Sequence, residues 1–251
     1  MTSSVLLFLG TFLASVVEAV EALTIALAVG IVRGWRSTLA GVAAAVVVLA
    51  AIVAALGPAL QHIPISTLRF VVGALLLAFG LQWLRKAVLR AGGFKPLHDE
   101  SEAFASEREQ AGAAASAKGG RTDWYSFTVA FKSVLLEGLE VAFIVLGFGS
   151  AQGKLGLAAA AAAAAVAVVV AVGFVVRGPL ARVPENTLKF VVGVLLTSFG
   201  IFWGGEGAGV AWPGSDLAIL ALVGFFALVS VALVRELRRW RTAIDPAPAR
   251  A

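Results

Sequence analysis

Long apolar runs follow one another along almost the whole chain, and each of them is able to cross a membrane. About 20 helical residues suffice to span the roughly 30 Å hydrocarbon core of a bilayer. Hydrophobic residues make up 60% of the 251-residue chain and charged residues only 14%, against roughly 25% charged residues in soluble domains. The alternating pattern of a membrane barrel is absent. The sequence therefore predicts an all-α polytopic membrane protein.

The apolar runs predict seven transmembrane helices and one long polar linker. The spans cover residues 5–32, 39–60, 68–84, 124–148, 157–176, 188–203 and 217–234. A linker rich in Ala and Ser separates the third span from the fourth, and within it residues 99–110 predict a short solvated helix. The first run continues well beyond the length of a signal-peptide core, and no basic residue precedes it. We therefore expect a retained first span.

Basic residues indicate the orientation, because loops on the cytoplasmic side carry an excess of Lys and Arg. They gather after spans one, three, five and seven, whereas the opposite side has only Arg69 and Lys154. This distribution predicts an N-terminus outside and a C-terminus in the cytoplasm, in the cytoplasmic (inner) membrane of a bacterium. It also accounts for the net charge of +5 without a nucleic-acid partner.

An internal duplication divides the chain into two repeats. Residues 63–83 and 183–203 share twelve identities over 21 aligned positions, from Pro64 and Pro184 to Trp83 and Trp203. Each repeat holds three spans, and an odd number of spans reverses the direction of the chain. The repeats are therefore inverted, which is typical of transporters whose substrate site lies near the midplane.

The duplication and the linker together predict the organisation of the chain. The expected segments are repeat 1 at 1–89, a cytoplasmic linker at 90–122, repeat 2 at 123–206, a seventh span at 207–236 and a cytoplasmic tail at 237–251. The seventh span is an addition without a counterpart in either repeat.

Two pairs of glutamates lie at equivalent places in the repeats, about halfway along spans one and four. They are Glu18 with Glu21 and Glu137 with Glu140. The i, i+3 spacing places both carboxylates of a pair on one helix face, and ionisable residues at this depth are usually functional. Four negative charges brought together there require bound protons or a bound cation, and competition between the two makes an ion/proton exchanger.

The available ligands are oxygen atoms. The chain has no cysteine, its one methionine is Met1, and both His62 and His98 lie outside the spans. Carboxylate and hydroxyl oxygens suit Ca²⁺, Mn²⁺, Mg²⁺ or iron, and this chemistry leaves the choice among them open. Intramembrane catalysis that depends on Cys or His, including a di-iron site of the Glu-x-x-His type, is excluded, so we expect no enzyme.

Five further residues are candidates for auxiliary roles. They are Ser15, Thr24, Ser133, Lys132 and Glu206. The hydroxyls would add ligand oxygens, and Lys132 either neutralises a carboxylate or extends to the cytoplasmic interface. Glu206 either gathers cations at the outer side or is simply solvated.

The paired motifs resemble two families. The first is the cation/proton exchanger family of transmembrane protein 165, whose inverted three-span repeats each carry Glu-x-Gly-Asp-Lys-Thr/Ser. Glu18 and Glu137 match the Glu of that motif, and Glu21 and Glu140 match its Asp, although the rest of the motif differs. This resemblance implies manganese or calcium as substrates.

The second resemblance is to the iron permease family, which has seven spans with Arg-Glu-x-x-Glu in spans one and four. The stretch from Leu136 to Glu140 is similar, but Val17 and Leu136 stand where that family has arginine. A sister family of uncharacterised bacterial membrane proteins with this ancestry would fit equally well.

We therefore expect a transporter of divalent cations (Mn, Ca or Fe) that exchanges them for protons by alternating access around the four glutamates. An iron permease for uptake is the alternative, and a membrane scaffold with structural glutamates is a further one. No permanently bound cofactor is expected. The expected partners are the lipid bilayer and metal ions, and a homo-oligomer is compatible with the sequence.

Overall fold

The structure is a computed structural model that describes residues 2–60, 62–97, 99–114, 123–176 and 185–244. The end of the predicted linker, the loop with Arg177 and Arg182, and the end of the predicted tail lie outside these ranges. The described residues form helices and no strand, which confirms the all-α prediction. The helices are α1 Thr2–Arg33, α2 Trp35–Leu60, α3 Ile65–Ala91, α4 Glu100–Ala113, α5 Trp124–Ala151, α6 Leu155–Val176, α7 Glu185–Gly207 and α8 Leu217–Ile244.

Six of the described helices are long and apolar enough to cross a membrane: α1, α2, α3, α6, α7 and α8. The prediction of seven spans also counts α5, which has 28 residues but carries Lys132, Glu137 and Glu140 and is not among the six. The predicted count is therefore approximate. The polar helix α4 lies within the predicted linker, where a short solvated helix was expected.

Local sequence signals explain where several helices begin and end. Gly34 separates α1 from α2 and has a φ of 100°, a left-handed conformation that glycine adopts without steric cost. The carboxylate of Asp99 accepts a hydrogen bond from the Ser101 amide at the start of α4. Asp123 accepts bonds from the Tyr125 and Ser126 amides at the start of α5. Aspartate is a favoured residue at such helix starts.

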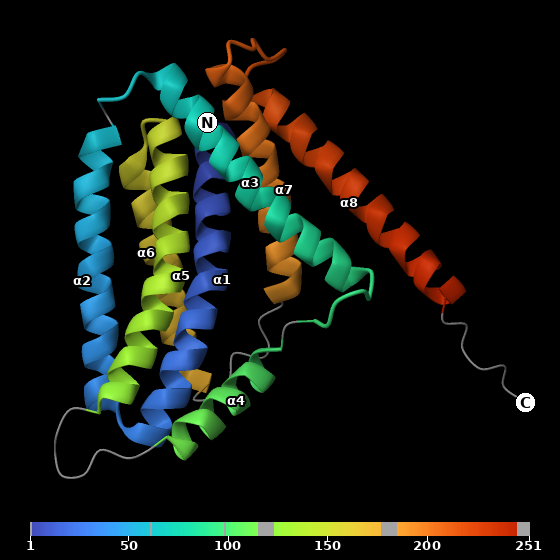
Figure 1. Cartoon of the computed structure of the whole chain (residues 1–251). Helices are drawn as coiled ribbons and strands as arrows, with labels where there is room; N and C mark the ends of the chain where they lie inside the picture. The colour runs from blue at the N-terminus through green and yellow to red at the C-terminus, as the bar shows by residue number, and fades with distance from the viewer. Residues whose placement is uncertain (1, 61, 98, 115–122, 177–184, 245–251) are drawn as a thin grey trace, which may run out of the picture. The chain divides into compact units, whose positions relative to one another are not determined.

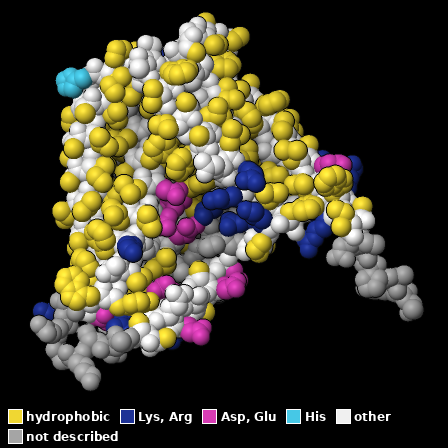
Figure 2. Space-filling model, viewed as in Figure 1, with side chains coloured by type: hydrophobic (Ala, Val, Ile, Leu, Met, Phe, Trp, Pro, Cys, Tyr) yellow, Lys and Arg dark blue, Asp and Glu magenta, His cyan; other side chains and the backbone are white. Residues whose placement is uncertain are grey.

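The chain forms two compact units that cut across the sequence repeats. The first contains α3, α7 and α8, and the second contains α2, α4, α5, α6 and α1 from Leu7 onward. In the second unit α1 and α5 stand side by side in Figure 1 and run in opposite directions. Hydrophobic side chains cover most of the face of α2 and α5 that Figure 2 shows, as expected for helices that contact lipid.

The first unit pairs the two duplicated segments with each other, because α3 packs mainly on α7. A Cβ at Gly80 would overlap the backbone nitrogen of Thr197, and a Cβ at Gly200 would overlap that of Leu77. Gly200 and Thr197 are the duplicated counterparts of Gly80 and Leu77. The two contacts are therefore equivalent under the duplication, which is the symmetry expected of inverted repeats. The small residues let the helices approach closely.

Helix α8 completes the first unit. Leu84 and Val88 of α3 and Val194 of α7 form a buried cluster against which Val223, Phe226 and Leu237 of α8 pack. At the end of α8, the Arg238 guanidinium donates a hydrogen bond to the Ala91 carbonyl. The seventh predicted span is thus part of the unit that contains α3 and α7.

In the second unit, an ion pair joins the end of α1 to the start of α5. The Arg33 guanidinium donates to both oxygens of Asp123, at 2.7 and 3.0 Å, and to the carbonyls of Ala111 and Ala114 at the end of α4. It also lies 5.0 Å from the centre of the Tyr125 ring. One buried side chain therefore connects α1, α4 and α5, and it fixes α1 and α5 as antiparallel neighbours.

The Arg33–Asp123 pair gives a prediction about pH. The hydrogen bond from Arg33 holds the pKa of the Asp123 carboxyl below its ordinary value of 3.8. A lowered folded-state pKa stabilises the fold above the unfolded-state pKa, and this contribution is lost as pH falls through the folded-state value. Asp123→Asn is expected to cost about 1.5–3 kcal/mol at neutral pH, because it removes a charge-assisted interaction.

Thermal unfolding of the purified protein and of Asp123→Asn in detergent measures this difference. The difference in unfolding free energy between the natural protein and Asp123→Asn should be constant above about pH 5 and shrink below about pH 4. Glu109→Gln on the exposed face of α4 is the control and should show no such gap. A gap that does not change with acidification would contradict the role given to the Asp123 charge.

Candidate metal site

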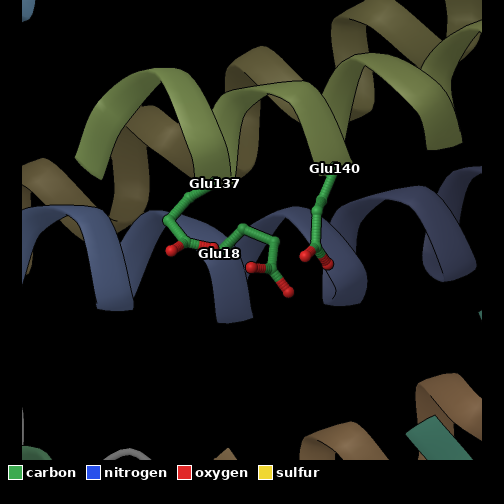
Figure 3. Close-up of side chains that lie close together, drawn as sticks. All are labelled: Glu18, Glu137 and Glu140. Carbon is green, nitrogen blue, oxygen red and sulfur yellow. The ribbon is translucent and has the colours of Figure 1, made fainter. Parts of the chain in front are cut away.

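Helices α1 and α5 bring three carboxylates together. Glu18 of α1 and Glu137 and Glu140 of α5 each offer a carboxylate oxygen, and these oxygens lie within 4.8 Å of one another. Figure 3 shows the three side chains directed toward one another from the facing sides of the two helices. Glu137 and Glu140 are one helical turn apart, so a single face of α5 presents both.

The pairing of α1 with α5 sets the depth of this group. Glu18 lies 15 residues before Arg33, and Glu137 lies 14 residues after Asp123, so the two glutamates are at nearly the same distance from the ion pair. At 1.5 Å per residue, the group is roughly 20 Å from that end of the helices. This places the carboxylates in the middle of the helix pair, as the sequence predicts.

The surroundings make the negative charges costly. Glu18 is 2% exposed, whereas Glu137 and Glu140 are partly buried. Two ionised carboxylates about 5 Å apart repel by about 3 kcal/mol at an effective dielectric constant of about 20. Three such groups therefore favour a bound cation or bound protons over three bare charges.

The fourth predicted ligand, Glu21, is not part of this group. It lies on α1 one turn beyond Glu18 and is partly buried. The structure thus brings together three of the four predicted carboxylates, one from the first repeat and two from the second.

The auxiliary candidates divide between the two units. Ser15 and Ser133 are buried and precede Glu18 and Glu137 by three and four residues, so each shares a helix face with its glutamate. Thr24 is also buried and lies one turn beyond Glu21. Lys132 is exposed, which favours extension to the interface over a role beside the carboxylates.

Glu206 belongs to the other unit and has a different role. Its carboxylate is 3.2 Å from the guanidinium of Arg69, and both residues lie in the unit of α3, α7 and α8. The ion pair offsets the charge that one of the two interpretations of Glu206, cation gathering at the outer side, requires. No local pattern predicts this pairing, because the two residues are far apart along the chain.

One feature of the site region was not singled out as functional from the sequence. It is the Arg33–Asp123 pair, for which the one available signal is an aspartate directly before a predicted helix. Thr11 and Ser126, which belong to the small polar faces expected on these two spans, are completely shielded from solvent.

The donor set is suited to hard or borderline cations. Among the described residues, the group contains carboxylates alone, and the neighbouring Ser15 and Ser133 carry hydroxyl oxygens. His62 is exposed and follows α2, away from the middle of the spans. Oxygen ligands without sulfur or imidazole match the predicted preference for divalent cations such as Mn²⁺, Ca²⁺ or Fe²⁺.

A comparison with protein families supports a metal-ion transporter. Residues 7–93 match the model of a family described as ferrous iron uptake permease, iron-lead transporter. The match covers about a third of the chain, including α2, α3 and most of α1 with Glu18 and Glu21. Comparisons with curated proteins and with solved structures gave no match. The resemblance to iron permeases thus finds support over the first repeat, and that to the transmembrane protein 165 family stays a prediction.

Proposed function

We propose that this protein is a membrane transporter of divalent metal cations, with Fe²⁺ as its preferred substrate. The observation that carries the proposal is the group of Glu18, Glu137 and Glu140, which places three oxygen ligands within 4.8 Å of one another in the middle of two antiparallel helices. The iron permease match over residues 7–93 favours iron among the cations that oxygen ligands accept. Catalysis is not part of the proposal.

Glu21 is the proposed fourth carboxylate of the site. It occupies in the first repeat the place that Glu140 occupies in the second, and Glu140 is already within the group. A change in side-chain rotamer on cation binding is enough to redirect a glutamate. Four carboxylates would then surround the ion symmetrically, two from each repeat.

Proton coupling follows from the same residues. Carboxylates that repel one another without a cation are neutralised either by the metal ion or by protons, and both compete for the same oxygens. Protons that enter the site from one side displace the cation into the solution on that same side. A site that opens alternately to each side, as in inverted-repeat transporters, turns this competition into exchange. We propose such exchange in the cytoplasmic membrane, with the C-terminus in the cytoplasm.

Flux into liposomes tests the proposed function. The purified full-length protein is reconstituted with a metal-sensitive dye inside, and Fe²⁺, Mn²⁺, Ca²⁺ and Pb²⁺ are added outside in turn. We expect Fe²⁺ flux above that of protein-free liposomes, and we expect an opposing pH gradient to change its rate. An Fe²⁺ flux whose rate does not depend on the pH gradient would favour an uncoupled permease. If none of the cations enters the liposomes, the membrane scaffold is favoured.

A further inference from the structure

Four buried hydroxyl groups in α1 and α5 differ from the other buried hydroxyls of the protein. They belong to Thr11, Ser15 and Thr24 of α1 and to Ser133 of α5. Each of these residues is at most 6% exposed. Among the residues that the structure describes, their hydroxyl oxygens have no hydrogen-bond partner.

Buried hydroxyls elsewhere are bonded within their own helices. Thr38 donates to the Gly34 carbonyl, Thr197 to that of Gly193 and Ser198 to that of Val194. This bond to the carbonyl four residues earlier is the usual way in which a helix satisfies a buried hydroxyl. Since a buried polar group without a hydrogen bond is unfavourable, the four hydroxyls of α1 and α5 point to a partner that is not part of the chain.

The hydroxyls share helix faces with the carboxylates. Thr11, Ser15 and Glu18 are spaced i, i+4, i+7 on α1, which keeps them on one face. On α5, Ser126 and Ser133 precede Glu137 by eleven and four residues and fall on one face in the same way. Thr11, Ser15 and Ser133 are therefore directed along the same stripes that hold the carboxylate group, whereas Thr24 lies about 120° around α1 from Glu18.

The two rows extend from the carboxylates in opposite directions, because α1 and α5 are antiparallel. Ser15 and Thr11 lie about 4.5 and 10 Å from Glu18 along the axis, toward the start of α1. Ser133 and Ser126 lie about 6 and 16 Å from Glu137, toward the Arg33–Asp123 end. Thr24 lies on this second side, one turn from Glu21.

Small side chains leave these faces unfilled by bulky apolar groups. Before Glu137, the buried residues of α5 are Ser126, Ala130 and Ser133. A buried helix face is ordinarily filled by large apolar side chains at native packing density. The buried face of α5 before Glu137 instead presents small side chains and hydroxyl oxygens.

We propose that these rows are two half-paths that carry the cation to and from the carboxylates, one opening at each side of the membrane. The inference rests on the proposed transport function and assigns Thr11 and Ser15 to the outer half-path and Ser133 to the cytoplasmic one. Hydroxyl oxygens replace part of the water around a divalent cation. Because they are neutral, they hold it less tightly than the carboxylates, so the ion moves on to the site.

Single cysteines test the two half-paths directly, because the natural chain contains none. Ser15→Cys and Ser133→Cys are treated with a charged, membrane-impermeant thiol reagent from either side of oriented vesicles. We expect the reagent to modify the Ser15→Cys thiol when it is added on the outer side and the Ser133→Cys thiol when it is added on the cytoplasmic side. Fe²⁺ should slow both reactions. Val17→Cys and Ala142→Cys are equally buried, lie on other faces of the same helices and should not react.

Flux measurements separate a path from a structural role. Ser15→Ala and Ser133→Ala should each lower the Fe²⁺ transport rate by about 2- to 10-fold, the effect of one lost polar interaction, with unchanged thermal stability. Ser198→Ala, which removes a bonded hydroxyl from α7, should leave the rate unchanged. The half-paths are wrong if the natural protein transports Fe²⁺, the two serine-to-alanine variants transport it at the same rate, and the Ser15→Cys and Ser133→Cys thiols react no faster than those of the controls. If the natural protein transports no cation, the function itself is wrong.

Discussion

Glutamine in place of Glu18 is expected to abolish metal binding and transport while the fold stays intact. Glu18 is the most deeply buried of the three grouped carboxylates, and glutamine keeps its size while removing its charge. Loss of a residue that merely supports a metal ligand typically costs 10- to 100-fold in affinity, so loss of a direct ligand should cost at least about 100-fold. Glu137→Gln should behave in the same way.

Binding and stability must be measured together for this prediction. Fe²⁺ or Mn²⁺ affinity is obtained by calorimetry on the purified protein in detergent, flux in liposomes, and stability by thermal unfolding without metal. Removing one of three mutually repelling charges relieves strain, so Glu18→Gln should unfold at the same temperature as the natural protein or higher. Loss of function with unchanged or increased stability is the signature of a ligand, as residues of functional sites are often costly to the fold.

The matched control is a glutamate outside the group. Glu206→Gln removes a carboxylate that is paired with Arg69 in the other unit, and it should leave Fe²⁺ affinity and flux unchanged. Full transport in both Glu18→Gln and Glu137→Gln would show that the group is structural. That result would favour the scaffold interpretation of the glutamates.

Alanine at Gly80 is expected to destabilise the pair of α3 and α7 by about 1–3 kcal/mol, the usual cost of overpacking a tight contact. The added Cβ would overlap the backbone nitrogen of Thr197, and backbone atoms do not move aside cheaply. Gly200→Ala should have a similar effect, because its Cβ would meet the backbone of Leu77 in the equivalent contact. Thermal unfolding in detergent measures both changes.

Gly204 provides the control within the same helix pair. The nearest atom to a Cβ at Gly204 is 3.8 Å away, an ordinary van der Waals contact. Gly204→Ala should therefore be neutral, or stabilising by up to about 1 kcal/mol, since alanine favours a helix over glycine. Equal effects of alanine at Gly80 and Gly204 would contradict the close approach of α3 and α7.

The helices themselves follow from local sequence. Apolar runs of sufficient length, glycine at a chain reversal and aspartate before a helix act within one or two turns, so they are visible in the chain. The duplication that contains Gly80 and Gly200 is visible in the chain in the same way, and it predicts the inverted repeats. Helix α5 is less clear, because its three charged residues reduce the apolar signal that identifies a span.

The carboxylate group was predicted only in part. The spacing of Glu137 and Glu140 places both on one face of α5, and the duplication makes Glu18 their counterpart. Whether Glu21 joins them depends on the rotation of α1 about its axis and on its side-chain rotamer, which no local pattern encodes. The ion pairs of Arg33 with Asp123 and of Arg69 with Glu206 join residues distant in sequence, and they were likewise not foreseen.

The sequence alone determined that the chain is helical, that it carries helices able to cross a membrane, and that carboxylates lie near the middle of two of its predicted spans. Composition and periodicity determine these properties. The properties depend on the free energy of transferring each segment out of water and on which side chains share a helix face. The tertiary structure decided which helices share a unit, which three glutamates meet and which hydroxyls are left without a partner in the chain. These features depend on how helices distant in sequence pack together, and that is decided by side-chain shape across the contacts.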